Sequence, residues 1–309
     1  MTPFRLFPER NTPMDMSVCF KYIYLSTVVI CTSSLICFGQ SDVVYSENDL
    51  RVFSDYVSAF GDKKDKPVGE LVVETGKYFS GKPYVGGTLD HTTSEKLVVD
   101  LTKFDCTTLV ETCLALSRML GDPSFDSCRP ITDNFEIYTR KLQEIRYRSG
   151  NITGYPSRLH YFSDWIYDNQ LKGIVKDVTQ SIGGVEYPVK TGFMSSHPDK
   201  YPQLVNNPLF VQEIAETESN INARTYYYIP KASIVEKIAL IQTGDIIAFT
   251  TGIPGLDISH VGFAVCREGE CYLLHASLSE NKVVVSSQPL ISYTQSVKRH
   301  TGIMVVRPL

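Results

Sequence analysis

The chain has 309 residues, a formal net charge of −4 and eight cysteines. This length suffices to bury one large core, although length alone would also allow two domains. The charge balance is slightly acidic, and basic clusters are no longer than short pieces such as Lys63-Lys64. We therefore expect no nucleic-acid partner.

The first forty residues differ from all that follow. Lys21 precedes a charge-free stretch over residues 22–38, and Cys37 and Gly39 are small residues at the positions that cleavage after Gly39 requires. We expect residues 1–40 to be a cleaved signal peptide and the membrane to be contacted only through it. An uncleaved anchor is the alternative, since about seventeen residues is close to the lower limit for a spanning helix. A lipid-modified cysteine is disfavoured, because bulky isoleucines precede the candidates.

Cleavage would leave five cysteines, since three of the eight precede Gly39. They are Cys106, Cys113, Cys128, Cys266 and Cys271. In an oxidising compartment an odd number leaves at least one thiol unpaired, which raises the question of whether one of them is reactive.

Helical patterns dominate the next part of the chain. A lead-in helix is predicted around residues 50–60, and the segment 69–87 predicts a short amphipathic helix followed by a loop that closes on two glycines. Tyr84 lies in that loop. Residues 101–123 carry apolar side chains at helical spacing, which indicates a buried helix.

Both ends of this buried helix are marked. Asp105 is a favoured N-cap residue, Gly121 supplies a left-handed stop, and Pro123 prevents continuation. The helix is therefore predicted to begin at Cys106.

Residues 122–242 are rich in Tyr, Pro, Asn and Gly, with helices predicted at 134–146 and 159–170. No flexible linker or repeat separates them, so we interpret them as an insertion in a single catalytic domain, residues 41–309. The predicted strands of the final third are residues 245–249, 260–266, 271–276, 283–285 and 302–307. Helices followed by antiparallel strands indicate an α+β domain.

Cys106 is placed to act as a nucleophile. A cysteine attacks as the thiolate, and the first turn of a helix offers free backbone N–H groups and a positive dipole end, which lower a thiol pKa. The same N–H groups can donate to the oxyanion formed when an amide carbonyl is attacked. The alternative is a small core residue, an interpretation that Cys113 in the apolar stripe fits better.

A thiol nucleophile needs a base, and the base needs an orienting partner. If residues 267–270 form a hairpin loop, Cys266 lies opposite Cys271. Continuing that register places His260 and His275 on one face as diagonal neighbours, which suits a hydrogen bond between the rings. For each histidine alone, a structural role would be the better interpretation.

The same residue types could bind zinc, but an extended strand separates His260 from Cys266 by about 20 Å, which is too far for a shared ion. We therefore expect no metal and no other cofactor. The facing cysteines, Cys266 and Cys271, could instead form a disulfide across the hairpin.

Five short motifs occur in one order: Tyr84 with Gly86-Gly87, Asp105-Cys106, Gly244-Asp245, His260-Val261-Gly262 and His275-Ala276. Each is weak alone, but five in order make a specific signal. The chain resembles the NlpC-type, papain-like cell-wall peptidases, which implies a nucleophile helix packed on an antiparallel sheet. The resemblance implies Cys106 as nucleophile and His260 as base, oriented by His275. Tyr84 and Asp105 would lie beside the oxyanion.

The chain departs from that pattern at several places. Thr107-Thr108 replace the usual Ser-Gly, Val85 replaces an aromatic residue, and the insertion is longer than in γ-D-glutamyl-diaminopimelate endopeptidases. In these departures and in the segment at 157–166 (SRLHYFSDWI), the chain resembles a separate branch of the superfamily. That branch was formerly of unknown function and is assigned as N-acetylmuramoyl-L-alanine amidases. That branch implies hydrolysis of the amide between the lactyl group of N-acetylmuramic acid and L-alanine, in the periplasm or cell envelope.

The expected partner is peptidoglycan or a muropeptide, bound by a monomer. Sugars stack on aromatic faces and Arg binds carboxylates bidentately, so Trp165 and Arg158 are candidate substrate-binding residues, with ordinary packing as the alternative. Two rival functions stay open. One is an endopeptidase that cuts between D-glutamate and the third stem residue, and the other is a non-catalytic wall-binding module.

Overall fold

The structure is a computed structural model that describes residues 43–91 and 94–309. The predicted signal peptide lies outside the described residues. Within the described part, none of the helices combines the length and apolarity needed to cross a membrane.

The strands of the second half of the chain form an antiparallel sheet. They are β3 (Val175–Asp177), β4 (Val185–Tyr187), β5 (Tyr226–Pro230), β6 (Ile246–Thr251), β7 (Ile258–Arg267), β8 (Glu270–Ser277), β9 (Lys282–Pro289) and β10 (His300–Pro308). The order is β4-β5-β10-β6-β7-β8-β9, and β3 also pairs with β10. The strands predicted in the final third are all present, and each is longer than expected by one or more residues.

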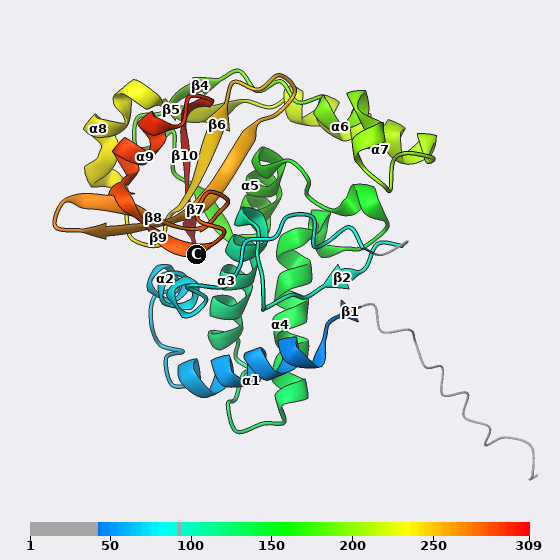
Figure 1. Ribbon diagram of the computed structural model, residues 1–309, viewed down its shortest axis with the longest axis vertical. Helices are drawn as coiled ribbons and strands as arrows, with labels where there is room; N and C mark the ends of the chain where they lie inside the picture. The colour runs from blue at the N-terminus through cyan, green and yellow to red at the C-terminus, as the bar shows by residue number, and fades with distance from the viewer. Residues whose placement is uncertain (1–42, 92–93) are drawn as a thin grey trace, which may run out of the picture. The chain divides into compact units, whose positions relative to one another are not determined.

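Helices cover both faces of this sheet (Figure 1). On one side lie α1 (Glu47–Phe60), α2 (Val68–Tyr78), α3 (Cys106–Leu120), α4 (Ile131–Arg146) and α5 (Phe162–Leu171). On the other side lie the short α8 (Ile234–Lys237) and α9 (Leu290–Ser296). Helix α3 contacts β7 and β8, while α9 contacts β8 and β9.

Alternate side chains of each strand enter two separate cores, as the two-residue period of a strand requires. On β6, Ile246 and Ala248 belong to the core shared with α2 and α3, whereas Ile247 and Phe249 belong to the core shared with α8 and α9. Because both faces are covered, this strand is apolar at successive positions instead of alternating with polar residues.

The predicted insertion, residues 122–242, contributes strands to the sheet. It supplies α4 and α5, then α6 (Phe193–Ser196) and α7 (Pro208–Asn222), together with β3, β4 and β5. Both β3 and β5 pair with the late strand β10. A parallel pair, β1 (Val43–Val44) with β2 (Leu97–Val98), lies beside the helices. Single 3₁₀ turns occur at Arg148–Gly150, Tyr155–Ser157, Pro198–Lys200, Lys231–Ser233 and Ile238–Leu240.

The end of α3 differs from the prediction. Gly121 has φ −83° and ψ −1°, which is a right-handed conformation, so the expected left-handed stop is wrong. The chain instead leaves the helix through a turn in which the Asp122 N–H donates to the Met119 carbonyl at 3.0 Å. This turn needs no positive φ, and any residue could occupy position 121 on that ground.

The hairpin between β7 and β8 has the predicted register but a tighter turn. Arg267 pairs with Glu270, so the turn consists of Glu268 and Gly269, both with positive φ. This is the two-residue turn whose twist matches that of paired strands. Cys266 and Cys271 face each other and form a disulfide, which confirms the predicted pairing.

Gly244 and Asp245, just before β6, contact α2 and β10 respectively. Gly244 has φ +91°, and an added Cβ would lie 2.1 Å from the Gly69 carbonyl oxygen at the start of α2. Asp245 accepts two hydrogen bonds from the Arg307 guanidinium of β10, at 2.8 and 2.9 Å. The glycine permits close packing, and the carboxylate holds β6 to β10.

We predict that Gly244→Ala lowers the free energy of unfolding by about 3 kcal/mol or more, because backbone strain and a clash with backbone act together. Gly173→Ala is the matched control, since Gly173 has φ +68° and open space around the added Cβ. It should cost only about 1–2 kcal/mol. Urea denaturation measures both, and equal losses would contradict the role assigned to the close approach.

Candidate active site

Cys106 is the first residue of α3, as predicted. The Thr108 backbone N–H donates to the Asp105 carboxylate at 2.7 Å, and the Asp105 N–H donates to the Thr108 hydroxyl at 2.9 Å. This reciprocal capping box fixes where the helix begins. It also engages Oδ1 of the Asp105 carboxylate, and the binding role expected for this side chain stays a prediction.

Cys106 is half-buried and lines a cavity of about 220 Å³. His260 and Val261, at the start of β7, line the same cavity. Cys106 and Val261 line it together, so the start of α3 and the start of β7 meet at this point. The insertion contributes Leu159, His160, Tyr161, Phe162, Met194 and Tyr201 to the lining.

The two predicted histidines are bonded to each other. His260 Nε2 lies 2.7 Å from His275 Nδ1, with the ring planes at 81°. The expectation that β7 and β8 would bring these rings together is therefore correct. Tyr293 of α9 packs against the pair, its ring centroid 6.2 Å from that of His260 and 5.3 Å from that of His275.

Both imidazoles are held neutral. Burial lowers the pKa of His260 well below its usual value, and the nearby His275, His300 and Arg299 lower it further. Burial lowers the pKa of His275 to about 4. For His260 Nδ1 to accept a proton, Nε2 must carry the hydrogen and donate to His275 Nδ1, which fixes the tautomer of each ring in a working site.

The ionisation of Cys106 differs from the expected direction. Burial raises the pKa of the thiol to about 12, the Asp105 charge adds to this, and the Val261 N–H and Thr107 lower it. The expectation of a thiolate stabilised at the helix N-terminus is therefore corrected. Burial therefore favours a protonated thiol at Cys106 and a neutral imidazole at His260.

Tyr84 lies next to the segment that leads into α3. The Tyr84 backbone forms a β-bridge with Phe104, which lies just before the α3 cap. Burial raises the pKa of the Tyr84 phenol to about 12, and the charges of Cys106 and Asp105 contribute in the same direction. The hydroxyl therefore stays protonated and can donate a hydrogen bond. The bridge to Phe104 brings the Tyr84 backbone beside the start of α3, and its place beside the oxyanion stays a prediction.

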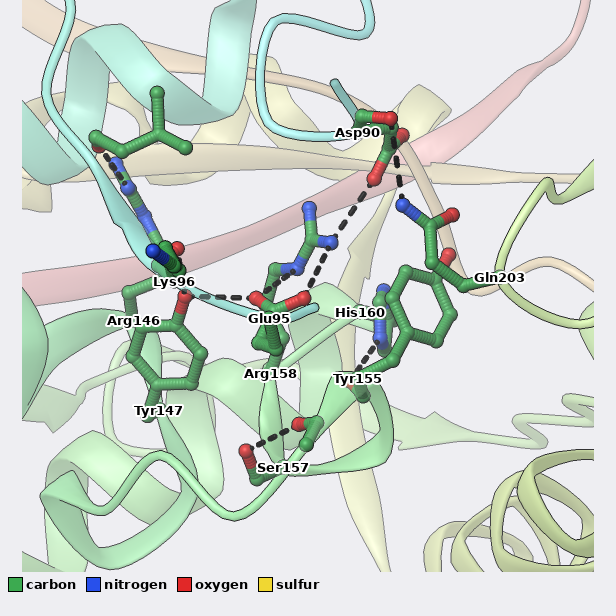
Figure 2. A network of polar contacts seen from close by, with 12 residues as sticks. Asp90, Glu95, Lys96, Arg146, Tyr147, Tyr155, Ser157, Arg158, His160 and Gln203 are labelled. Carbon is green, nitrogen blue, oxygen red and sulfur yellow. Dashed lines mark hydrogen bonds and ion pairs between the residues drawn. The ribbon is translucent and has the colours of Figure 1, made fainter. Parts of the chain in front are cut away.

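The two proposed substrate-binding residues of the insertion are engaged elsewhere. Trp165 is 0% exposed and stacks on Phe162 with centroids 4.7 Å apart, so its ring cannot meet a sugar. Arg158 is 7% exposed and forms ion pairs with Asp90 at 2.9 Å and Glu95 at 3.0 Å (Figure 2). Ordinary packing, the alternative interpretation, holds for Trp165, and an internal ion-pair network accounts for Arg158.

A larger cavity of about 450 Å³ lies on the α9 side of the histidine pair. His260 and His275 line it together with Tyr293, Arg299 and His300, which the sequence analysis did not single out. Its remaining lining is rich in hydroxyls: Ser277, Ser279, Ser286, Ser287 and Ser296. His260 thus borders two cavities, one with Cys106 and one with Arg299.

The sequence and the fold correspond to a known family. The family model described as AmiA-like, N-acetylmuramoyl-L-alanine amidase-like, matches residues 74–303, and the chain belongs to this family. Membership implies a hydrolase that acts on peptidoglycan. A search of curated proteins finds no match.

Solved structures resemble the chain over most of its length. An N-acetylmuramoyl-L-alanine amidase from Bacteroides uniformis is 37% identical, with a TM-score of 0.72 over 78% of this chain and 99% of that chain. A Bacteroides fragilis protein, provisionally named a xylanase, is 39% identical, with a TM-score of 0.70 over 76% of this chain and 99% of that chain. A Legionella pneumophila protein, 22% identical with a TM-score of 0.61 over 85% and 94% of the two chains, shares the fold alone.

The raised pKa of Cys106 gives a testable pH dependence. Alkylation by iodoacetamide should accelerate about tenfold per pH unit from pH 6 to 9, because thiolate stays the minor species below the thiol pKa. The exposed Cys128, measured in Cys106→Ala, provides the reference rate. A plateau near neutral pH would instead indicate a preformed thiolate–imidazolium pair.

Proposed function

We propose that the protein is a cysteine-type N-acetylmuramoyl-L-alanine amidase with a papain-like arrangement, in which a nucleophile helix faces a histidine on the sheet. The observation that carries the proposal is the shared cavity of Cys106 and His260, with His260 held by His275. Family membership supplies the substrate class. The proposal places the enzyme in the cell envelope as a monomer, exported by residues 1–40.

In the proposed reaction, the Cys106 sulfur attacks the lactyl carbonyl carbon while His260 Nδ1 takes the thiol proton. His260 then gives that proton to the nitrogen of L-alanine, the C–N bond breaks, and the peptide leaves with a free amine. Water attacks the thioester, passing one proton to His260, and the C–S bond breaks to release the lactyl carboxyl group and restore the thiol. His275 stabilises the transient charge on His260 by accepting from Nε2.

The oxyanion formed in this reaction would find donors at the start of α3. The Cys106 backbone N–H belongs to the first turn, where N–H groups have no partner within the helix. The neutral Tyr84 hydroxyl can supply a second donor. Asp105 contributes by holding the first turn in place through Thr108.

The two cavities around His260 fit the two halves of this substrate. His260 must protonate the departing nitrogen, so the leaving peptide must lie against His260. The larger cavity offers the Arg299 cation, the Glu280 carboxylate and a set of serine hydroxyls, which suit the charged groups and amides of a stem peptide. The Cys106 cavity, whose lining includes the partly exposed ring of Tyr201 from the insertion, suits the sugar.

A glycoside hydrolase, which the provisional name of the Bacteroides fragilis relative would suggest, fits less well. Such enzymes usually need two carboxyl groups about 5–9.5 Å apart across the bond. Among the described residues that line the Cys106 cavity, Asp257 is the one carboxylate, and backbone N–H groups of Ser163 and Ile258 each donate to it at 2.7 Å.

Product analysis with defined muropeptides tests the proposal. The enzyme should release the whole stem peptide from L-alanine onward, and Cys106→Ala should lower turnover at least about a thousandfold while leaving binding intact. Cys113→Ala, a buried cysteine of the same helix, is the matched control and should keep activity.

Other products would support the rivals. A dipeptide left on the sugar would identify the endopeptidase, and binding with no thiol-dependent turnover would identify a wall-binding module. Activity that survives in Cys106→Ala would remove the thiol mechanism.

His275 should act through the orientation of His260. His275→Ala should lower kcat about 10–100-fold with little change in KM, because the acceptor for His260 Nε2 is lost. His275→Asn, whose amide oxygen can replace Nδ1 as acceptor, should recover most of that loss. Equal losses in both variants would mean that the ring is needed only for packing.

A further inference from the structure

His160 lines the Cys106 cavity but has no part in the reaction as derived above. It lies between the Tyr155–Ser157 turn and α5, in the insertion. Its Nε2 lies 2.9 Å from the Tyr155 carbonyl oxygen. A carbonyl oxygen can only accept a hydrogen bond, so Nε2 must carry the hydrogen of the ring. Nδ1 is therefore the unprotonated nitrogen, an acceptor with a lone pair.

The surrounding network holds this ring in place (Figure 2). The Tyr155 ring packs on the imidazole with centroids 4.4 Å apart, and the Arg158 guanidinium lies 4.9 Å from the centroid of Tyr155. Arg158 is in turn fixed by Asp90 and Glu95. The network thus links the loop around residue 90 to the wall of the cavity.

The same network keeps the ring neutral. Burial lowers the pKa of His160 to about 3, and the positive charge of Arg158 lowers it further in the same direction. Nδ1 therefore remains an acceptor at any pH at which the protein would work. The half-buried imidazole lines the cavity, and its Nδ1 carries a lone pair that a ligand there can engage.

We propose that His160 Nδ1 accepts a hydrogen bond from an N–H or O–H group of the substrate in the Cys106 cavity, and so makes His160 a specificity-determining residue. This inference rests on the proposed function and deepens it. A donor at that position would be bound, whereas a carboxylate or carbonyl oxygen would face a lone pair and be rejected. The acetamido N–H of the sugar, the half of the substrate that the proposed function assigns to this cavity, is the expected donor, and the peptide N–H that follows L-alanine is the comparison.

Steady-state kinetics of two His160 variants provide the first test. His160→Leu should lower kcat/KM about 10–100-fold, mainly through KM, because a substrate donor loses its acceptor. His160→Gln can donate to the Tyr155 carbonyl and accept with its amide oxygen, so it should stay within about threefold of wild type. His197→Leu is the matched control, because His197 also bonds a carbonyl, that of Phe193 at 3.0 Å, outside the cavity. It should leave kcat/KM unchanged.

Substrate analogues identify the donor. One is methylated at the acetamido nitrogen and the other at the amide that follows L-alanine, so each lacks one N–H. Wild type should turn over the analogue that lacks the relevant donor more slowly than the unmodified substrate. His160→Leu should turn over the two at nearly equal rates, because the variant and the analogue remove the same hydrogen bond. Full additivity for both analogues would overturn the assignment to an N–H, and a 6-deoxy sugar would then test the hydroxyl by the same criterion.

A spectroscopic readout avoids any folding defect of the variants. In Cys106→Ala with ¹⁵N-labelled histidine, substrate binding should move the Nδ1 resonance of His160 in the direction of a hydrogen-bonded nitrogen. An unchanged resonance with bound substrate would overturn the inference. The outcomes separate the two proposals. Absence of turnover by wild type contradicts the proposed function, whereas turnover with no change in the His160 Nδ1 resonance contradicts only this inference.

Discussion

The hydrogen bond between His260 and His275 depends on the register of one hairpin. The two rings lie on β7 and β8, and they meet at 2.7 Å because Cys266 faces Cys271 at the other end of the same strands. A slip by one residue would turn one of the two rings to the opposite face of the sheet. The two-residue turn and the disulfide both oppose such a slip. Structural features about six residues away along β7 thus secure the position of the proposed base.

The proposed nucleophile comes from the opposite layer, so its position depends on how α3 contacts the sheet. The capping box fixes the first residue of the helix, and the packing of α3 on β7 and β8 holds the helix against the sheet. Burial at this junction favours the uncharged form of both the thiol and the imidazole. Charge would then develop only during the reaction, next to groups already oriented to receive it, which is how preorganised sites lower a barrier.

Much of this arrangement could be predicted from local sequence signals. Asp105 predicted where α3 begins, and the spacing of His260, Cys266, Cys271 and His275 predicted the hairpin register, because strand geometry is regular. The burial and the contacts of Trp165 and Arg158 could not be predicted. No sequence pattern identifies Phe162, Asp90 and Glu95 as their partners. The pKa of Cys106 could not be predicted for a related reason. Helix position is visible in a sequence, but the burial that raises the pKa depends on the whole fold.

The place of β10 in the sheet has a consequence for how the chain folds. β10 follows the other strands in sequence, yet it lies between β5 and β6 and also pairs with β3, more than a hundred residues earlier. Until residues 300–308 are available, β4-β5 and β6-β7-β8-β9 remain two half-sheets with open edges. Pairing over such sequence separations is slow, and open edges invite association between chains. The sheet therefore closes late in folding. Until β10 has paired, separation from other copies of the chain would protect the open edges from aggregation.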